Sequence, residues 1–225
     1  MNETLYAFLL STLAGFSTLI GFLFLWIKPK KQENIIIISL SFAAGVMSSI
    51  SIIELFPEGF SLINHKFTIF GSLLIFFIFI NVGVILSKWI DEHMESDNAL
   101  YKLGIVSMLA IVLHNIPEGI ATFLTTGENP TLGVSLALSI AFHNIPEGIS
   151  ISIPIYYSTK SKWKAFLYTF LASLSEPFGA FLAFIIFKNW ITDIFMGCLY
   201  TFIAGIMLNI SLRSCYRNPF HTIIK

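Results

Sequence analysis

The feature that most limits how this chain can fold is a series of long segments without charge. Residues 5–27 (LYAFLLSTLAGFSTLIGFLFLWI) form an uncharged run of 23 residues, and residues 67–87 form another of 21. A helix needs about 20 apolar residues to cross a hydrocarbon core of about 30 Å. Only 12% of the 225 residues are charged, against about 25% in a soluble domain. The sequence therefore predicts an all-α, polytopic helical membrane protein.

Seven transmembrane helices are expected, in a single domain over residues 1–225, because the connections are too short for a separate soluble domain. The expected spans are 5–27, 35–56, 67–88, 101–126, 131–157, 164–187 and 190–212. The first span is expected to be retained, since basic residues follow its apolar run rather than precede it. The longest connection, 89–100, holds four acids and one histidine. It is expected to be solvated, with weak cation capture as the alternative.

The basic residues are unevenly divided between the two ends of these spans. One end has 11 of the 13: Lys28, Lys30, Lys31, Lys88, Lys102, Lys160, Lys162, Lys164, Arg213, Arg217 and Lys225. Lys66 and Lys188 lie at the other end. Because cytoplasmic loops carry an excess of basic residues, the sequence predicts a multi-pass protein of the cell (inner) membrane. The N-terminus and the turn at 127–130 are expected outside, and the C-terminus in the cytoplasm.

Other features exclude some classes of protein and suggest an internal repeat. Cys198 and Cys215 have no metal-ligand spacing and give no disulfide framework. A formal net charge of 0 without a basic stripe excludes a nucleic-acid partner.

Residues 43–51 (AAGVMSSIS) and 203–211 (IAGIMLNIS) match at an offset of 160. Their spans run in opposite directions, so they are either inverted repeats, as in many transporters, or small-residue surfaces for close helix packing.

The hexapeptide HNIPEG occurs twice, at 114–119 and 143–148, inside two expected spans. His114 lies about 12 residues before the turn at 127–130, and His143 about 12 residues after it. At about 1.5 Å per residue, both lie about 18 Å from the outer end, which is near the middle of the membrane. The short turn makes the two spans antiparallel neighbours, so both histidines are expected at a similar depth.

Within each copy the glutamate falls angularly between the histidine and the asparagine. Relative to His114, Asn115 is rotated by about 100° and Glu118 by about 40° around the helix. The same holds for His143, Asn144 and Glu147. One carboxylate oxygen can therefore point to the histidine side and the other to the asparagine side. We expect one cation between the His/Glu sides, a second between the Asn/Glu sides, and bridging glutamates.

The prolines and a third carboxylate fit this hypothesis. Pro117 and Pro146 cannot donate to the carbonyls of Leu113 and Phe142, so each is expected to kink its helix where transporters place ion sites. Glu176 lies near the middle of the sixth span. Three ionised carboxylates there would cost about 2.5–3.5 kcal/mol each, and no lysine or arginine lies mid-span to neutralise them. A divalent cation with imidazole and carboxylate ligands would do so.

Simpler readings of single residues remain open. A lone histidine or asparagine in a membrane more often forms an interhelical hydrogen bond than a metal bond. Met47, in the second span, is by itself more typical of packing than of ligation. The two identical hexapeptides at matched depth, together with Glu176, favour a functional site, because ionisable residues inside membranes usually mark one.

The chain resembles the ZIP (Zrt/Irt-like) metal transporters, specifically the bacterial ZupT-like branch. Its residues 35–212 carry the resemblance, through SFAAGVMSSISIIELFPEGF in the second span, HNIPEGIATFLTT and HNIPEGISISIPIYY in the fourth and fifth, and SLSEPFGAFLAF in the sixth. The resemblance implies import of Zn(II), and also of Fe(II), Mn(II), Co(II) or Cd(II), into the cytoplasm without ATP. The metal would be the transported substrate, and no resident cofactor is expected.

The resemblance also implies a two-metal site at the middle of the membrane. One metal would be bound by His114, Glu118, His143 and Glu147, with Met47 as a further ligand. The other would be bound by Asn115, Glu118, Asn144, Glu147 and Glu176. Some relatives have another residue where His143 stands, so its role is less general than that of His114. An elevator-like motion of spans one, four, five and six against the others is implied as well, and a homodimer.

One departure from the family pattern leaves alternatives open. The family has eight spans with both termini outside, whereas no apolar run follows residue 212 here, so an eighth span is expected to be absent. A non-transporting metal-binding remnant is therefore one alternative. An intramembrane metal-dependent hydrolase is another, although the sequence has no HExxH pattern.

Overall fold

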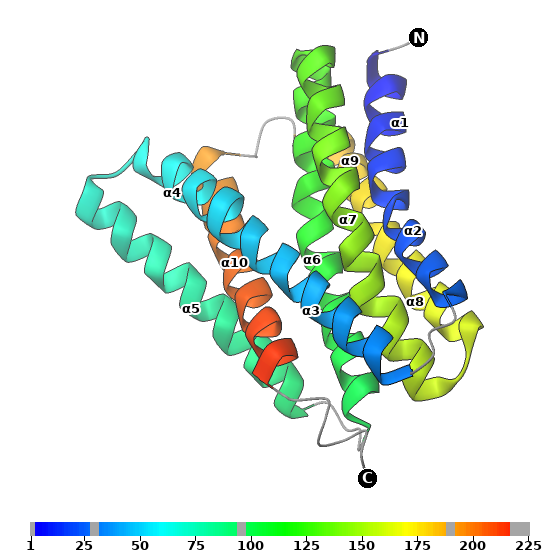
Figure 1. Ribbon diagram of the computed structural model, residues 1–225. Coiled ribbons are helices and arrows are strands. Elements are labelled where there is room, and N and C mark those ends of the chain that lie inside the picture. The colour runs from blue at the N-terminus through cyan, green and yellow to red at the C-terminus, as the bar shows by residue number, and fades with distance from the viewer. Residues whose placement is uncertain (1–2, 28–31, 94–97, 188–191, 217–225) are drawn as a thin grey trace.

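The computed structural model describes residues 3–27, 32–93, 98–187 and 192–216, and these residues form helices without any β-strand (Figure 1). The helices long and apolar enough to span a membrane are Glu3–Trp26, Asn34–Asn64, Ile69–Ile90, Ala99–Glu128, Pro130–Thr159, Lys162–Ile185 and Asp193–Leu212. The prediction of seven spans is confirmed, with six of them ending within a few residues of the expected positions.

Several spans are built from more than one helical segment. The first contains α1 (Glu3–Phe16), α2 (Thr18–Leu23) and η1 (Phe24–Trp26); the second contains α3 (Gln32–Ile50), η2 (Ser51–Leu55) and α4 (Phe56–Asn64). The third, fourth and fifth are single helices, α5 (Ile69–His93), α6 (Ala99–Glu128) and α7 (Pro130–Thr159). The last two contain α8 (Lys162–Ser173), α9 (Ser175–Leu182), η3 (Ala183–Phe187) and α10 (Asp193–Tyr216).

The helices form two groups that meet along α3 and α7 and along α10 and α6 (Figure 1). In the first group, α1, α2, α8 and α9 surround the antiparallel pair α6 and α7. In the second, α3, α4 and α5 pack on α10. Two apolar cores join the groups: one lies around the isoleucines 149, 151, 153 and 155 of α7 and includes Ile36 of α3, and the other lies around Met47 of α3 and Met207 of α10 and includes Ala110 of α6.

The tight connection between α6 and α7 depends on Asn129. This residue ends α6 and caps α7, and its side-chain oxygen accepts hydrogen bonds from the backbone N–H groups of Thr131 and Leu132 at 3.1 and 3.3 Å. An asparagine in this position satisfies N–H groups that the first turn of a helix leaves unpaired. The hairpin therefore places the two HNIPEG copies on adjacent helices, as the sequence predicts. We call this end of the molecule the turn end.

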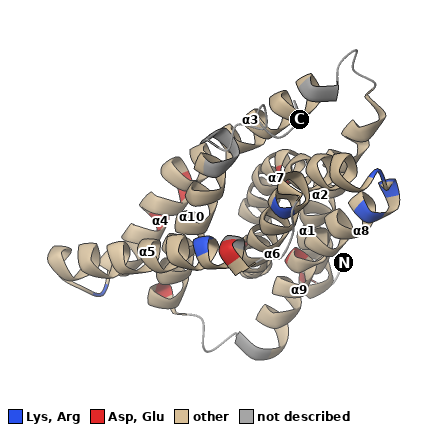
Figure 2. Cartoon of the chain, turned by 90° about the horizontal axis from the view of Figure 1, so that it is seen from below, with Lys and Arg blue, Asp and Glu red and all other residues tan. Residues whose placement is uncertain are grey.

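The opposite end, called the basic end, carries the described members of the basic cluster. Lys88 lies near the end of α5 and Lys102 near the start of α6, while Lys160, Lys162 and Lys164 flank the connection from α7 to α8. Figure 2 views the molecule from this end. The other members, Lys28, Lys30, Lys31, Arg217 and Lys225, lie outside the described residues, as do Lys188 and the side chain of Arg213.

The expected end of the second span, at residue 56, is wrong. The helix continues to Asn64 through the π-helical turn η2, in which the N–H of Phe56 donates to the carbonyl of Ser51. Pro57 explains the wider turn: its ring would clash with the carbonyl of Ile53 in a regular α-helix, and it has no N–H to donate. Single π-turns often occur at functional sites in helices.

The helices are interrupted in other spans than those in which Pro117 and Pro146 predict a kink. Neither Pro117 nor Pro146 breaks its helix, since α6 and α7 run continuously through them. Besides the π-turns η2 and η3, the interruptions lie in the first span, at Ser17, and in the sixth, at Leu174. Beside each one a serine hydroxyl donates to a backbone carbonyl three residues earlier, Ser17 to Ala14 and Ser175 to Ala172. Serine bonds of this kind compete with the helical pattern and bend helices.

The glycine of each HNIPEG copy packs against one of these interrupted spans. A Cβ atom on Gly119 would lie 1.9 Å from the carbonyl oxygen of Glu176, and one on Gly148 would lie 1.8 Å from that of Thr18. Only glycine lets the backbones approach this closely. Packing therefore explains the glycine that ends each HNIPEG copy: α6 contacts the start of α9, and α7 contacts the start of α2.

The weak repeat in the second and seventh spans has matching local structure. The hydroxyl of Ser51 donates to the carbonyl of Met47, and that of Ser211 donates to the carbonyl of Met207, both at 2.8 Å. Close helix packing through small residues, the other interpretation of this match, occurs at Gly205 but not at Gly45. A Cβ on Gly205 would lie 2.3 Å from the carbonyl of Ile80, whereas one on Gly45 would meet nothing within 4 Å.

Replacing the repeat glycines should test this packing. We expect Gly119→Val or Gly148→Val to lower the free energy of unfolding by about 1–3 kcal/mol or more, because the added side chain forces two backbones apart. Thermal unfolding of the purified protein in detergent measures the effect. Gly45→Ala is the matched control in a spanning helix, and should change stability by less than about 1 kcal/mol. Equal stability of all three variants would contradict the packing.

Candidate metal centre

The two HNIPEG copies bring their polar side chains into one buried layer between α6 and α7. The exposed fraction is 8% or less for every one of the six polar residues and for Glu176 of α9. These residues are His114, Asn115, Glu118, His143, Asn144, Glu147 and Glu176. Because α6 and α7 are antiparallel neighbours, the histidine of one copy faces the glutamate of the other. We refer to this set as the central layer.

On the histidine side of the layer, one carboxylate oxygen is shared by both imidazoles. Oε1 of Glu118 lies 3.0 Å from Nε2 of His114 and 2.8 Å from Nε2 of His143, with which it forms a hydrogen bond. Oε1 of Glu147 lies 3.7 Å from Nε2 of His114. The ligand atoms of His114, Glu118 and His143 all lie within 4.8 Å of one another. Zinc binds such atoms at about 2.0–2.2 Å, so small side-chain rotations would let them share one ion.

On the asparagine side, Asn144 connects three helices. Its Nδ2 donates to Oε2 of Glu176 on α9 and to the carbonyl oxygen of Ala14 on α1, both at 3.0 Å. Both hydrogens of the amide are used, and its carbonyl oxygen Oδ1 remains without a protein partner. Asn115 is completely buried, and neither polar atom of its side chain has a partner. The asparagines thus present oxygen atoms, the ligand type that suits hard divalent cations.

The central layer contains more buried acceptor oxygens than the protein supplies with hydrogen-bond donors. Those without a hydrogen-bond partner are Oε2 of Glu118, both carboxylate oxygens of Glu147, Oε1 of Glu176, Oδ1 of Asn115 and Oδ1 of Asn144. Among the described residues no lysine or arginine is buried. Buried charges are normally paired or bind metal. Three carboxylates facing two imidazoles leave a negative excess that a divalent cation would offset.

Oε1 of Glu118 faces both histidines, as the angular argument expects, and Oε2 has no hydrogen-bond partner; that Oε2 faces the asparagine side stays a prediction. The structure brings His114, His143, Glu118 and Glu147 together on one side, and Asn144 and Glu176 on the other. Met47 is 1% exposed and packs in the apolar cluster that includes Ile203 and Met207 and also Ala110 of α6. Its role as a ligand stays a prediction.

A cavity of about 450 Å³ connects the central layer with the turn end. It is lined by Ile53, Glu54, Leu55, Pro57, Glu58, Glu118, Ala121, Thr125, Leu136, Ile140 and Tyr200. Sequence reasoning missed Glu54, Glu58 and Tyr200. The sequence did contain a signal for Glu54, because this acid lies inside the expected span 35–56 and ionisable residues within spans usually have a function.

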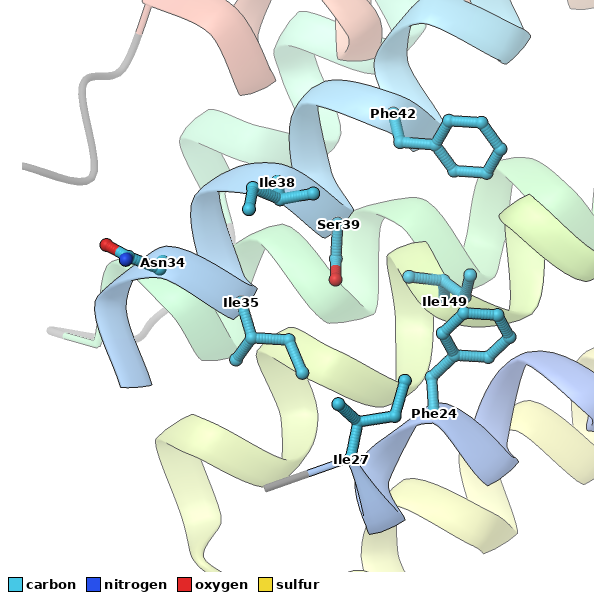
Figure 3. A pocket seen from close by; sticks show the side chains of 8 residues that line it. All are labelled: Phe24, Ile27, Asn34, Ile35, Ile38, Ser39, Phe42 and Ile149. Carbon is cyan, nitrogen blue, oxygen red and sulfur yellow. The ribbon is translucent and has the colours of Figure 1, made fainter. Parts of the chain in front are cut away.

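A second cavity, of about 320 Å³, lies toward the basic end and is different in chemistry (Figure 3). The described residues of its lining, Phe24, Ile27, Asn34, Ile35, Ile38, Ser39, Phe42 and Ile149, include no carboxylate or imidazole. Between this end and the central layer, the apolar core around Ile151 and Ile153 is fully buried. Within the part of the chain that the structure describes, the cavity with carboxylates that reaches the central layer is the one on the side of the turn end.

Comparison with known proteins agrees with this geometry. A family model described as ZIP Zinc transporter matches residues 88–215, which contain both HNIPEG copies and Glu176. The zinc transporter ZupT of Clostridium perfringens is 38% identical, and the alignment covers 94% of this chain and 86% of that protein. ZupT of Chlorobaculum parvum is 39% identical with the same coverage. ZupT of Streptococcus mutans is 37% identical, with coverage of 94% and 87%.

These similarities extend over nearly the whole chain and include the residues of the central layer. A buried set of imidazole and carboxylate ligands between two spanning helices is what passage of a divalent metal ion through a membrane requires. The chain therefore belongs to the ZIP family of divalent metal transporters, which are transporters and not enzymes.

Proposed function

We propose that this protein imports zinc into the cytoplasm through two metal positions in the central layer. The observation that carries the proposal is the environment of Glu118, whose Oε1 lies between two imidazoles while its Oε2 is buried and unpaired. A carboxylate with both oxygens available in this way can bridge two cations. The relatives are named as zinc transporters, which supports zinc as the main substrate.

The first position would be formed by His114, His143, Glu118 and Glu147. Two nitrogen and two oxygen ligands suit the tetrahedral coordination of Zn²⁺. Met47 of α3 would add a thioether ligand to this position.

The second position would be formed by oxygen atoms alone on the protein side. Its ligands would be Asn115, Asn144, Glu118, Glu147 and Glu176. Oxygen ligands without imidazole favour harder ions, which would let Fe²⁺ and Mn²⁺ share this position. Co²⁺ and Cd²⁺ are proposed as further substrates of the same path.

Import would proceed from the turn end to the basic end. The excess of lysines at the basic end supports a cytoplasmic location for it, with the N-terminus outside the cell and the protein in the cell (inner) membrane. The ligands on α6, α7 and α9 belong to one of the two helix groups. Movement of this group against α3, α4, α5 and α10 would carry the metal across, and a homodimer would anchor the group that stays fixed.

The two alternatives are less well supported. A hydrolase needs a metal with an open position and a general base beside it, and the family consists of transporters. A non-transporting metal-binding protein would not need the polar cavity that joins the central layer to the turn end.

Removing single carboxylates should separate the two metal positions. We expect Glu118→Gln to abolish binding of both zinc ions together, because Glu118 bridges them, and Glu176→Gln to remove only the ion on the asparagine side. Equilibrium dialysis of purified protein with metal analysis counts the ions. Glu128→Gln, an exposed acid at the turn end, is the control and should bind as the unchanged protein does. Loss of a single ion in Glu118→Gln would contradict the bridge.

Uptake into proteoliposomes tests transport and its selectivity. We expect radioactive zinc to accumulate in vesicles that contain the unchanged protein and to stay at the background level with Glu118→Gln. Unlabelled Fe²⁺, Mn²⁺, Co²⁺ and Cd²⁺ should each compete, whereas Mg²⁺ should not, because it dehydrates reluctantly and prefers six oxygen ligands. Zinc flux that is the same with and without protein would reject the function.

A further inference from the structure

The cavity at the basic end lies across the boundary between the two helix groups. On one side its lining belongs to α3 of the second group, with Asn34, Ile35, Ile38, Ser39 and Phe42. On the other side are Phe24 of η1, Ile27 directly after η1, and Ile149 of α7 (Figure 3). Because Asn34 and Phe42 are eight residues apart, the cavity follows α3 for about 12 Å into the spanning segment. A ligand in this cavity would contact both groups.

The lining suits a hydrocarbon chain and not a hydrated ion. The polar side chains among its described residues are Asn34, near the start of α3, and Ser39. Apolar cavities of this kind exclude water and take apolar ligands. The volume is about 320 Å³, which is room for roughly ten groups of the size of a water molecule, at about 30 Å³ each. A stretch of an acyl chain fits these dimensions.

The cavity opens sideways toward the bilayer. Ile27, Ile38 and Phe42 of its lining are each more than half exposed, whereas Ile149 on its inner wall is buried. Exposed apolar side chains of a spanning segment contact lipid tails, which are as apolar as they are. An acyl chain can therefore enter from the leaflet at the basic end.

The charge beside the opening indicates which headgroup such a lipid carries. Nζ of Lys162 lies 4.7 Å from the centroid of the Trp26 ring, and Trp26 directly precedes Ile27 of the lining. Lys160 and Lys164 are exposed at the same connection between α7 and α8, and within the described part of the chain none of these lysines is paired with a carboxylate. Basic pockets between spanning helices bind anionic headgroups.

We propose that an anionic phospholipid binds at the basic end, with one acyl chain in this cavity and its headgroup at Lys160 and Lys162. The chain lies between α3 on one side and η1 and α7 on the other. A ligand shifts a conformational equilibrium only through a difference in affinity between the states, and a cavity that both helix groups form supplies such a difference. The bound lipid therefore favours the arrangement of the two groups described above. This binding does not depend on the transport function.

Native mass spectrometry of the purified full chain tests the acyl-chain site. With equal amounts of phosphatidylglycerol and phosphatidylcholine added, we expect phosphatidylglycerol to be retained in roughly tenfold preference. Ser39→Leu should lower this retention about fivefold or more, because the leucine occupies the space that the acyl chain needs. Ser49→Leu is the matched control, since it makes the same change at an exposed position of α3 outside the cavity lining, and should leave the retention unchanged.

The headgroup contact is tested by paired lysine variants. Lys160→Gln/Lys162→Gln should abolish the preference for phosphatidylglycerol over phosphatidylcholine. Lys88→Gln/Lys102→Gln removes the same charge at the same end, away from the connection between α7 and α8, and should keep the preference. Equal retention of the two lipids by the unchanged protein would overturn the proposal, and so would a preference that both double variants lose alike.

Tryptophan fluorescence keeps the proposal testable if Ser39→Leu does not assemble. Phosphatidylglycerol with brominated acyl chains should quench Trp26, which adjoins the lining, when the first equivalent of lipid binds. This quenching should be lost in Trp26→Phe, which keeps an aromatic ring beside Lys162. Quenching by the first equivalent that is the same in Trp26→Phe, or retention that is the same in a folded Ser39→Leu, indicates lipid on the outer surface only and would reject the site.

Discussion

The charge of buried carboxylates is the constraint on which the rest of this structure depends. Glu147 and Glu176 are 0% exposed and Glu118 is 7% exposed, and among the described residues no buried lysine or arginine balances them. The cationic partners that the described residues offer within the layer are His114 and His143, and several of the carboxylate oxygens have no hydrogen bond. Such an arrangement is stable only with protons, water or a metal ion among the ligands. The helix contacts around the layer serve to hold these groups at one depth while leaving a polar approach from one end.

Much of the central layer follows from residue spacing. The period of the α-helix, the short turn at Asn129 and the identical hexapeptides together predict that Glu118 lies between the histidine and asparagine sides, and that both copies meet at one depth. Seven spans follow from apolar runs alone. What spacing could not predict depends on contacts between distant segments. The interruptions at Ser17 and Leu174, rather than at Pro117 and Pro146, occur where α2 and α9 meet the repeat glycines. A proline can be accommodated inside a continuous helix, as Pro117 and Pro146 are, or after a π-turn, as Pro57 is. The residue spacing does not distinguish these two outcomes.

The two ends of the molecule differ in chemistry, and this difference supports the direction proposed for the transport path. The turn end has a cavity with carboxylates that reaches Glu118, while the basic end has an apolar cavity and a packed isoleucine core. Among the described residues, the polar approach to the central layer is therefore on the side of the turn end. The proposed ligands lie on α6, α7 and α9, whereas Glu54 and Glu58 of the same cavity lie on η2 and α4, which belong to the other helix group.

The most direct measurement is X-ray absorption at the zinc edge of the purified, zinc-loaded chain in lipid. The account predicts nitrogen and oxygen ligands at about 2.0–2.2 Å with the scattering pattern of imidazole, and loss of that pattern in His114→Ala/His143→Ala. Zinc coordinated without imidazole in the unchanged protein, or an imidazole signal that survives in the double variant, would contradict the claim that a divalent ion balances the buried carboxylates of the central layer.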